Sequence, residues 1–154
     1  QCLEEVGVPR DIAEPYYKTV RMRKFWLKEL LEHFNLSVNL YQKILDPNII
    51  PNFLNEEIVR SIEKIGKENC YILTHGGDEF QMDKIRSTGI VNLFREIIVV
   101  FSEKTGVVES ICKKHSDEVV VFIDDKQKHF DALDMSKCPN LKTILFGDES
   151  SLFL

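Results

Sequence analysis

Several signatures are missing from this sequence of 154 residues. No uninterrupted apolar run approaches the ~18 residues that span a bilayer, and no charged-then-apolar leader opens the printed sequence. We therefore expect a cytoplasmic protein with no membrane partner. The four cysteines form no CxxC pair and no cluster with histidine, which excludes the common zinc and haem signatures. Their wide spacing, without secretory features, predicts free buried thiols rather than disulfides.

An excess of basic residues is also missing. The 20 Lys and Arg stand against 25 Asp and Glu, so the formal net charge is −5. Sequence-independent binding to nucleic acid needs a basic surface, and we therefore expect no nucleic-acid partner. Hydrophobic residues at 44% and charged residues at 29% are typical of a globular protein that buries a core.

Glycine and proline are each scarce in one part of the chain. Six of the seven glycines lie at or after Gly66, whereas four of the five prolines lie at or before Pro51. The first part is rich in helical patterns, and the second alternates short apolar runs with helical stretches. This shift predicts a helical domain over residues 1–67 and an α/β domain over residues 68–154.

Within the first part, apolar residues recur at helical spacing from Asp11 to Asn35, which predicts one long amphipathic helix. Another side of this helix carries a basic stripe, formed by Lys18, Arg21, Lys24 and Lys28. A solvated surface explains the stripe, and attraction of an anionic substrate is the alternative interpretation. Arg23 falls in the apolar sector, where a charge needs a partner or an open cleft, so it is a candidate for substrate contact.

A loop and a second helix follow. Pro47 and Pro51 cannot continue a helix, which predicts a loop over residues 46–51. Asn55 is the predicted N-cap of the next helix, because its side chain can accept from free backbone N–H groups. Gly66 lies close to the expected end of that helix.

Four short apolar runs in the second part have the length of strands. They span residues 70–73, 97–101, 119–123 and 141–146. The middle two are β-branched and apolar almost throughout, as expected for strands covered on both faces. Helical stretches separate the runs, over residues 78–87, 105–115 and 126–133. The alternation predicts an α/β fold with right-handed βαβ units and a Rossmann-like parallel sheet.

Polar residues follow three of these runs. In open parallel sheets, ligands bind beyond the carboxyl ends of the strands, so these residues are candidates for a shared site. Asp124 and Asp125 follow the third run, and paired carboxylates suit a hard cation such as Mg²⁺. Lys104, which follows the second run, would offset the charge of a phosphate.

The first run is followed by Thr74, His75 and Gly76, which are candidates for phosphate binding. The Thr74 hydroxyl and the neighbouring backbone N–H groups would hold phosphoryl oxygens, and His75 would contribute mainly through its backbone. Each of these motifs alone is common in ordinary turns. Their placement at successive strand ends predicts a site for a phosphoryl group and a divalent cation.

These residues resemble the haloacid dehalogenase-like (HAD) hydrolase superfamily, most of whose members are Mg²⁺-dependent phosphatases. The resemblance covers about residues 70–147. The segment YILTHGG over residues 71–77 is similar to the family's second motif, Lys104 stands where the third-motif lysine is expected, and VVVFIDDK over residues 119–126 is similar to the fourth motif. The resemblance implies that residues 1–67 form a helical cap on a HAD-like core.

The family's first motif, an apolar strand that ends in DxD, does not occur in residues 1–154, and the sequence begins at Gln1 without an initiator methionine. We therefore expect roughly 15 to 25 further residues upstream, which would carry this motif as the core's first strand. The 154 residues alone are then expected to be inactive.

The resemblance also implies a reaction, the hydrolysis of a small phosphoester through an aspartyl-phosphate intermediate. The nucleophilic Asp would lie upstream of Gln1. Asp124 and Asp125 would hold Mg²⁺, while Lys104 and Thr74 would contact the phosphoryl group.

Two alternatives compete with this interpretation. A non-catalytic member of the same fold, acting as an interaction or regulatory protein, would explain the missing first motif. A phospho-receiver domain also places carboxylates, Thr and Lys at strand ends. Receivers carry the acidic pair before the Thr and the Lys, however, whereas Asp124 and Asp125 come after Thr74 and Lys104 here. The order of the residues therefore favours the HAD-like interpretation over a receiver.

Overall fold

The structure is a computed structural model that describes residues 3–21, 23, 26–48 and 54–147. The fold is mixed α/β and divides into two compact units, residues 1–101 and residues 102–154. Residues 1–67 thus share a unit with the first two strands, and the predicted domain boundary after residue 67 stays a prediction. Among the described residues, no helix combines the length and apolar character needed to cross a membrane.

The predicted single helix from Asp11 to Asn35 is wrong, because the chain turns back after Val20. Its helices are α1 (Arg10–Val20), α2 (Trp26–His33) and α3 (Asn39–Ile44), after a 3-10 turn over Glu4–Val6. In the turn, the Arg23 N–H donates to the Val20 carbonyl at 2.8 Å. A straight helix would leave its apolar stripe in water, whereas the turn packs α1 against α2 and buries Leu31 completely.

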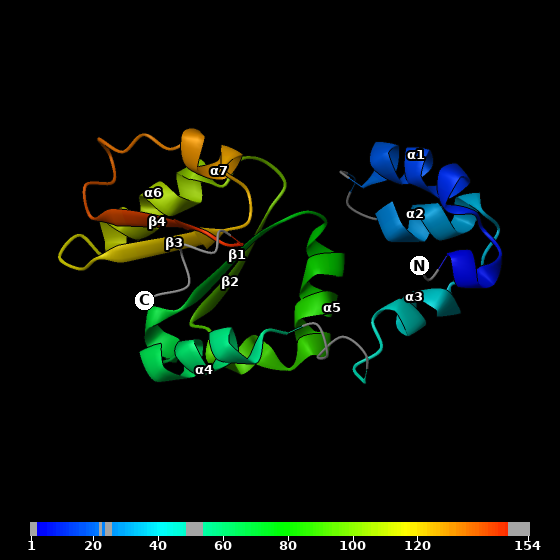
Figure 1. The fold of residues 1–154 in the computed structure, drawn as a ribbon, viewed down its shortest axis with the longest axis horizontal. Helices are drawn as coiled ribbons and strands as arrows, with labels where there is room; N and C mark the ends of the chain where they lie inside the picture. The colour runs from blue at the N-terminus through cyan, green and yellow to red at the C-terminus, as the bar shows by residue number, and fades with distance from the viewer. Residues whose placement is uncertain (1–2, 22, 24–25, 49–53, 148–154) are drawn as a thin grey trace. The chain divides into compact units, whose positions relative to one another are not determined.

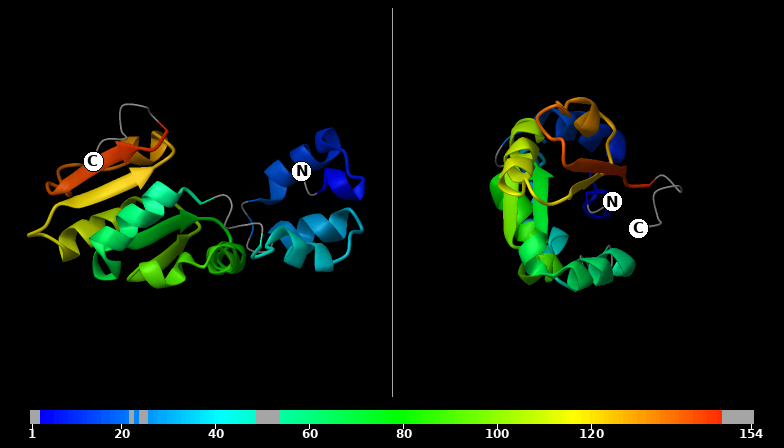
Figure 2. Two further views of the ribbon diagram at one scale, coloured as in Figure 1. Left: turned by 60° about the horizontal axis from the view of Figure 1, so that its bottom comes forward. Right: turned by 90° about the vertical axis from the view of Figure 1, so that its left-hand side faces the viewer.

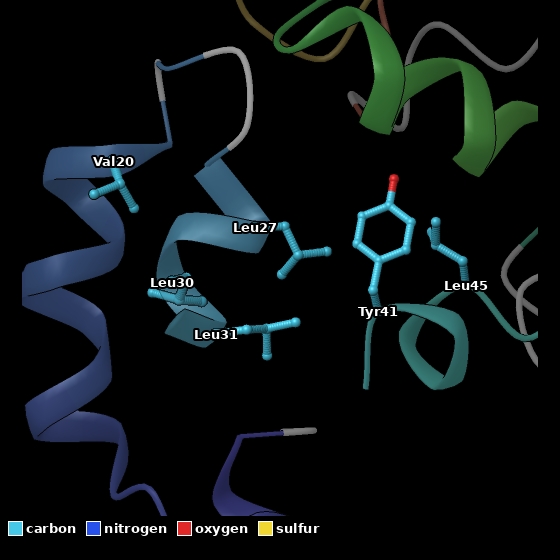
Figure 3. Close-up of a cluster of buried hydrophobic side chains, with 6 residues drawn as sticks. All are labelled: Val20, Leu27, Leu30, Leu31, Tyr41 and Leu45. Carbon is cyan, nitrogen blue, oxygen red and sulfur yellow. The ribbon is translucent and has the colours of Figure 1, made fainter. Parts of the chain in front are cut away.

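Figure 3 shows the core that this turn creates. Its buried side chains are Val20, Leu27, Leu30, Leu31, Tyr41 and Leu45. Phe80, from helix α5 (Asp78–Thr88), packs against this cluster, and the Tyr41 hydroxyl points towards α5 and donates to Asp83 Oδ2 at 2.7 Å. Burial and the hydrogen bond to Asp83 raise the pKa of Tyr41, so this hydroxyl stays protonated. Apolar and polar contacts therefore join the N-terminal helices to α5.

The second predicted helix is confirmed as α4 (Glu56–Ile65). The Asn55 Oδ1 accepts from the Glu57 and Ile58 N–H groups at 2.9 and 3.2 Å. Gly66 ends the helix with a φ of 86°. Of the predicted loop over residues 46–51, residues 46–48 are non-helical as expected, and residues 49–51 lie outside the described residues.

Replacing Asn55 with alanine is expected to lower the free energy of unfolding by about 1 kcal/mol, because two backbone N–H groups at the start of α4 lose their acceptor. Urea unfolding monitored by circular dichroism measures the change. Asn55→Ser keeps an acceptor oxygen and should recover most of the lost stability. If Asn55→Ser were as unstable as Asn55→Ala, the capping interaction would not be the cause.

All four predicted strands are present. They are β1 (Tyr71–His75), β2 (Glu96–Val100), β3 (Val120–Asp124) and β4 (Leu141–Leu145). β1 pairs with β2 in parallel, with Tyr71 opposite Glu96, and β3 pairs with β4 in parallel, with Val120 opposite Leu141 (Figures 1 and 2). The described residues thus form two parallel two-stranded sheets, one in each unit. A single Rossmann-like sheet stays a prediction.

A helix connects the strands of each parallel pair, as the alternating pattern predicted. Helix α5 lies between β1 and β2, and the short α7 (Lys128–Asp131) lies between β3 and β4; 3-10 turns cover Lys67–Asn69 and Ile90–Leu93. Helix α6 (Thr105–Lys114) packs on β3. On β3, Val121 and Ile123 are exposed among the described residues, so cover on both faces of this strand stays a prediction.

The cysteines behave as predicted wherever the structure describes them. Cys70, Cys112 and Cys138 are free and buried, while Cys2 lies outside the described residues. Burial raises the pKa of the Cys112 thiol to about 11, with a further contribution from Cys138. Burial also raises the pKa of the Cys70 thiol, and the three buried cysteines serve as small core side chains.

Candidate functional site

Asp124, the last residue of β3, is a buried carboxylate with a donor at each oxygen. Only 2% of its side chain is exposed. The Lys104 ammonium lies 2.5 Å from Oδ2, whereas the Lys126 N–H and the His129 Nδ1 each lie 2.9 Å from Oδ1. The backbone carbonyl of Asp124 accepts from the Phe146 N–H at 2.8 Å, which extends the pairing of β3 with β4. The position of the carboxylate is therefore fixed from both sides.

The Lys104 ammonium, the His129 ring N–H and the Lys126 backbone N–H keep this carboxylate ionised. Burial by itself would raise the pKa of Asp124, but hydrogen bonds from Lys104 and His129, together with the Lys104 charge, lower it to about 2. A buried charge is tolerated only when it is paired in this way. A carboxylate only accepts hydrogen bonds, so His129 carries its proton on Nδ1.

Local structure explains how Lys104 and His129 reach Asp124. Lys104 stands just before α6, and its carbonyl accepts from two N–H groups in the first turn of that helix. His129 lies in α7, and the next residue, Phe130, packs edge-on against Phe122 of β3 with ring centroids 5.4 Å apart. This aromatic contact holds α7 over β3 and brings His129 to the strand end.

The sequence interpretation missed His129. A signal was present, because a short helix that directly follows a strand folds back over it, and His129 lies five residues after Asp124. A donor five residues further along the chain, on a helix that folds back, can reach a carboxylate at the strand end. His129 therefore belongs to the candidate site together with Lys104 and Asp124.

Asp125, the second predicted metal ligand, is exposed beside Asp124. No three side chains of His, Cys, Asp or Glu gather into a metal site within the part of the chain that the structure describes. Mg²⁺ does not need such a cage, since one or two carboxylates with water and substrate phosphate suffice. The adjacent carboxylates of Asp124 and Asp125 supply this donor chemistry, which fits Mg²⁺.

Thr74, His75 and Gly76 lie at the carboxyl end of β1, within the unit of residues 1–101. Gln81 of α5, only 9% exposed, covers this turn: its Nε2 donates to the His75 carbonyl at 3.3 Å, and its Oε1 accepts from the Thr74 hydroxyl at 3.2 Å. The hydroxyl proton of Thr74 is thus directed at Gln81. A phosphoryl oxygen would have to replace Gln81 as the acceptor. The sequence interpretation missed this buried amide.

Arg23, the candidate for substrate contact, forms an ion pair with Glu29, and its side chain is 60% exposed. The partner that its charge was expected to need is therefore Glu29, and a role in substrate binding stays a prediction. Two members of the basic stripe also face acidic partners, since Lys18 pairs with Glu14 and Lys28 pairs with Glu79; Lys24 lies outside the described residues.

Of the predicted site residues, the structure brings Lys104 and Asp124 into direct contact, with Asp125 next in sequence. Thr74, His75 and Gly76 gather around Gln81 instead. Known protein families, curated proteins and solved structures were each compared with the chain, and none matches it. The residues of the site alone must therefore support any functional proposal.

Proposed function

We propose that this chain belongs to a HAD-like, Mg²⁺-dependent phosphatase that hydrolyses a small phosphoester. The supporting observation is the buried, ionised Asp124 held against Lys104 at the end of β3. Phosphoryl transfer needs a group that attracts a cation and a group that attracts an anion, placed close together. Asp124 and Lys104 are such groups, and strand ends are where ligands bind in α/β folds.

Within this proposal each residue has one task. Asp124 and Asp125 would hold Mg²⁺, whose charge would offset that of the phosphoryl oxygens. Lys104 would bind a phosphoryl oxygen, and Thr74, with the His75 and Gly76 backbone, stays a predicted contact. The proposed nucleophile, an Asp upstream of Gln1, would bond to phosphorus while the ester oxygen leaves and takes up a proton. Water would then cleave the acyl phosphate, releasing inorganic phosphate and restoring the carboxylate.

A non-catalytic role is the second candidate, and one observation favours it. Both oxygens of Asp124 already have donors, as in an ion pair whose task is to fix β3, α6 and α7 together. In that case the ion pair would be purely structural, and the protein would act by binding a partner. Activity with and without the metal separates the two candidates.

The full-length protein is expected to hydrolyse an aryl phosphate in the presence of Mg²⁺ and to lose this activity in EDTA. Asp125→Asn should weaken Mg²⁺ binding by roughly 10-fold, because one candidate oxygen ligand loses its charge. Asp117→Asn, which neutralises another exposed acid ahead of β3, serves as the matched control and should leave turnover unchanged. Undiminished turnover in EDTA would contradict the metal assignment, and no turnover under any condition would favour the non-catalytic role.

A further inference from the structure

Lys104 and Asp124 form a buried ion pair at the end of β3. The Lys104 Nζ lies 2.5 Å from Asp124 Oδ2, and the two side chains are 12% and 2% exposed. The ammonium also lies 5.9 Å from the centre of the Phe122 ring, whose face attracts cations. The carbonyl of Lys104 is fixed by N–H groups of α6. Lys104 is therefore a well-held internal cation of this site.

The other carboxylate oxygen of Asp124, Oδ1, is less accessible to a cation than Oδ2. Oδ1 already accepts from the Lys126 N–H and the His129 Nδ1, each at 2.9 Å. These two donors direct positive charge at Oδ1 and leave Oδ2 as the oxygen that a cation approaches. Mg²⁺ binds carboxylate oxygens at about 2.0–2.1 Å, so on Oδ2 it would lie against the ammonium. Repulsion between the two charges excludes their binding together.

We propose that the Lys104 ammonium and a divalent cation are alternative partners of Asp124 Oδ2, so that Lys104 weakens cation binding and is released when a cation binds. This inference rests on the proposed function, which takes Asp124 as a Mg²⁺ ligand. The released ammonium keeps its charge and becomes available to an anionic group such as a phosphoryl oxygen. Cation and anion would then bind cooperatively, because the cation removes the internal partner of the lysine.

Calorimetric titration of the full-length protein with MgCl₂ tests this competition. Lys104→Met is expected to bind Mg²⁺ roughly 10-fold more tightly than the wild type, because the competing ammonium is gone. Lys104→Gln, which is neutral and can still donate a hydrogen bond, should give an intermediate affinity. Lys113→Met removes one positive charge from an exposed position of α6 and should change the affinity by less than about 2-fold, because solvent and salt screen distant charges.

Thermal unfolding gives a second readout that tolerates an unstable variant. Lys104→Met leaves a buried carboxylate without its ammonium, so Mg²⁺ should raise the unfolding temperature of this variant more than that of the wild type. If Lys104→Met is unfolded without metal, Mg²⁺ should restore its circular dichroism spectrum. Both results would support the competition.

Two results would overturn the inference. The first leaves the proposed metal role of Asp124 intact, whereas the second overturns that role as well. If the wild type binds Mg²⁺ and Lys104→Met binds it no more tightly, Lys104 does not compete, although the proposed metal role of Asp124 stands. If neither protein binds Mg²⁺, or if binding persists in Asp124→Asn, the cation does not bind at Asp124. The metal assignment of the proposed function then fails together with the competition.

Discussion

Replacing Asp124 with asparagine is expected to abolish Mg²⁺-dependent hydrolysis in the full-length protein and to destabilise residues 102–154 by about 3–5 kcal/mol. The amide has one acceptor oxygen and one N–H₂ donor, whereas both oxygens of Asp124 face donors. In either orientation the N–H₂ group would meet Lys104 or the pair of Lys126 and His129. Loss of activity in this variant therefore needs a structural control.

A double-mutant cycle supplies this control, because it measures how strongly Lys104 and Asp124 stabilise each other without any assay of activity. Lys104→Met and Asp124→Leu should each lose about 3–5 kcal/mol of stability, since each leaves one buried charge alone. The double variant should lose much less, because an apolar pair of similar volume carries no unpaired charge. Urea unfolding, with hydrogen exchange of the β3 peptides as the local readout, measures the cycle. Additive losses would show that the ion pair is not coupled and would contradict the geometry.

The pH dependence of stability gives an independent check on this carboxylate. The pKa of Asp124 is lowered to about 2 in the folded state, whereas an unfolded Asp titrates near roughly 3.9. Its stabilising contribution is therefore complete above the unfolded pKa and is lost as the pH falls from about 4 towards 2. Across this pH interval, the free energy of unfolding of the wild type should fall towards that of the Lys104→Met/Asp124→Leu double variant. A difference in unfolding free energy that stayed constant with pH would contradict the assigned pairing.

The features that the sequence predicted are those that neighbouring residues determine. The apolar runs over residues 97–101 and 119–123 are strands because β-branched side chains favour extended backbone, and both form strands here. Asn55 caps α4 because its acceptor lies beside the N–H groups that need it. Each of these predictions used only residues within one turn or one strand.

The features that the sequence did not predict depend on contacts between distant residues. The helical pattern from Asp11 to Asn35 continues through the turn near Arg23, and only the packing of α1 on α2 favours breaking it. Similarly, the position of Gln81 over the end of β1 depends on how α5 packs beside that strand. His129 reaches Asp124 only through α7. Periodicity carries no information on such contacts.

Gly76→Ala is expected to destabilise residues 1–101 by about 2–4 kcal/mol, the second large effect. Gly76 has a φ of 143°, which L side chains rarely adopt, and such a conformation costs about 1–3 kcal/mol. An added Cβ would also lie 2.7 Å from Gln81 Nε2. Gln81 is buried and bonded to both Thr74 and His75, so its movement would break both hydrogen bonds.

Fluorescence of Trp26, the sole tryptophan, measures this effect during urea unfolding, because its ring lies 4.8 Å from that of Phe80 in α5. Gly89→Ala is the matched control, since Gly89 has a φ of 77° but open space around its Cβ position; its loss should reflect backbone strain alone. Gln81→Ala removes the clash together with both Gln81 hydrogen bonds, so in a Gln81→Ala background Gly76→Ala should cost only the backbone strain. If Gly76→Ala cost as much in the Gln81→Ala background as in the wild type, the contact with Gln81 would contribute nothing to the loss.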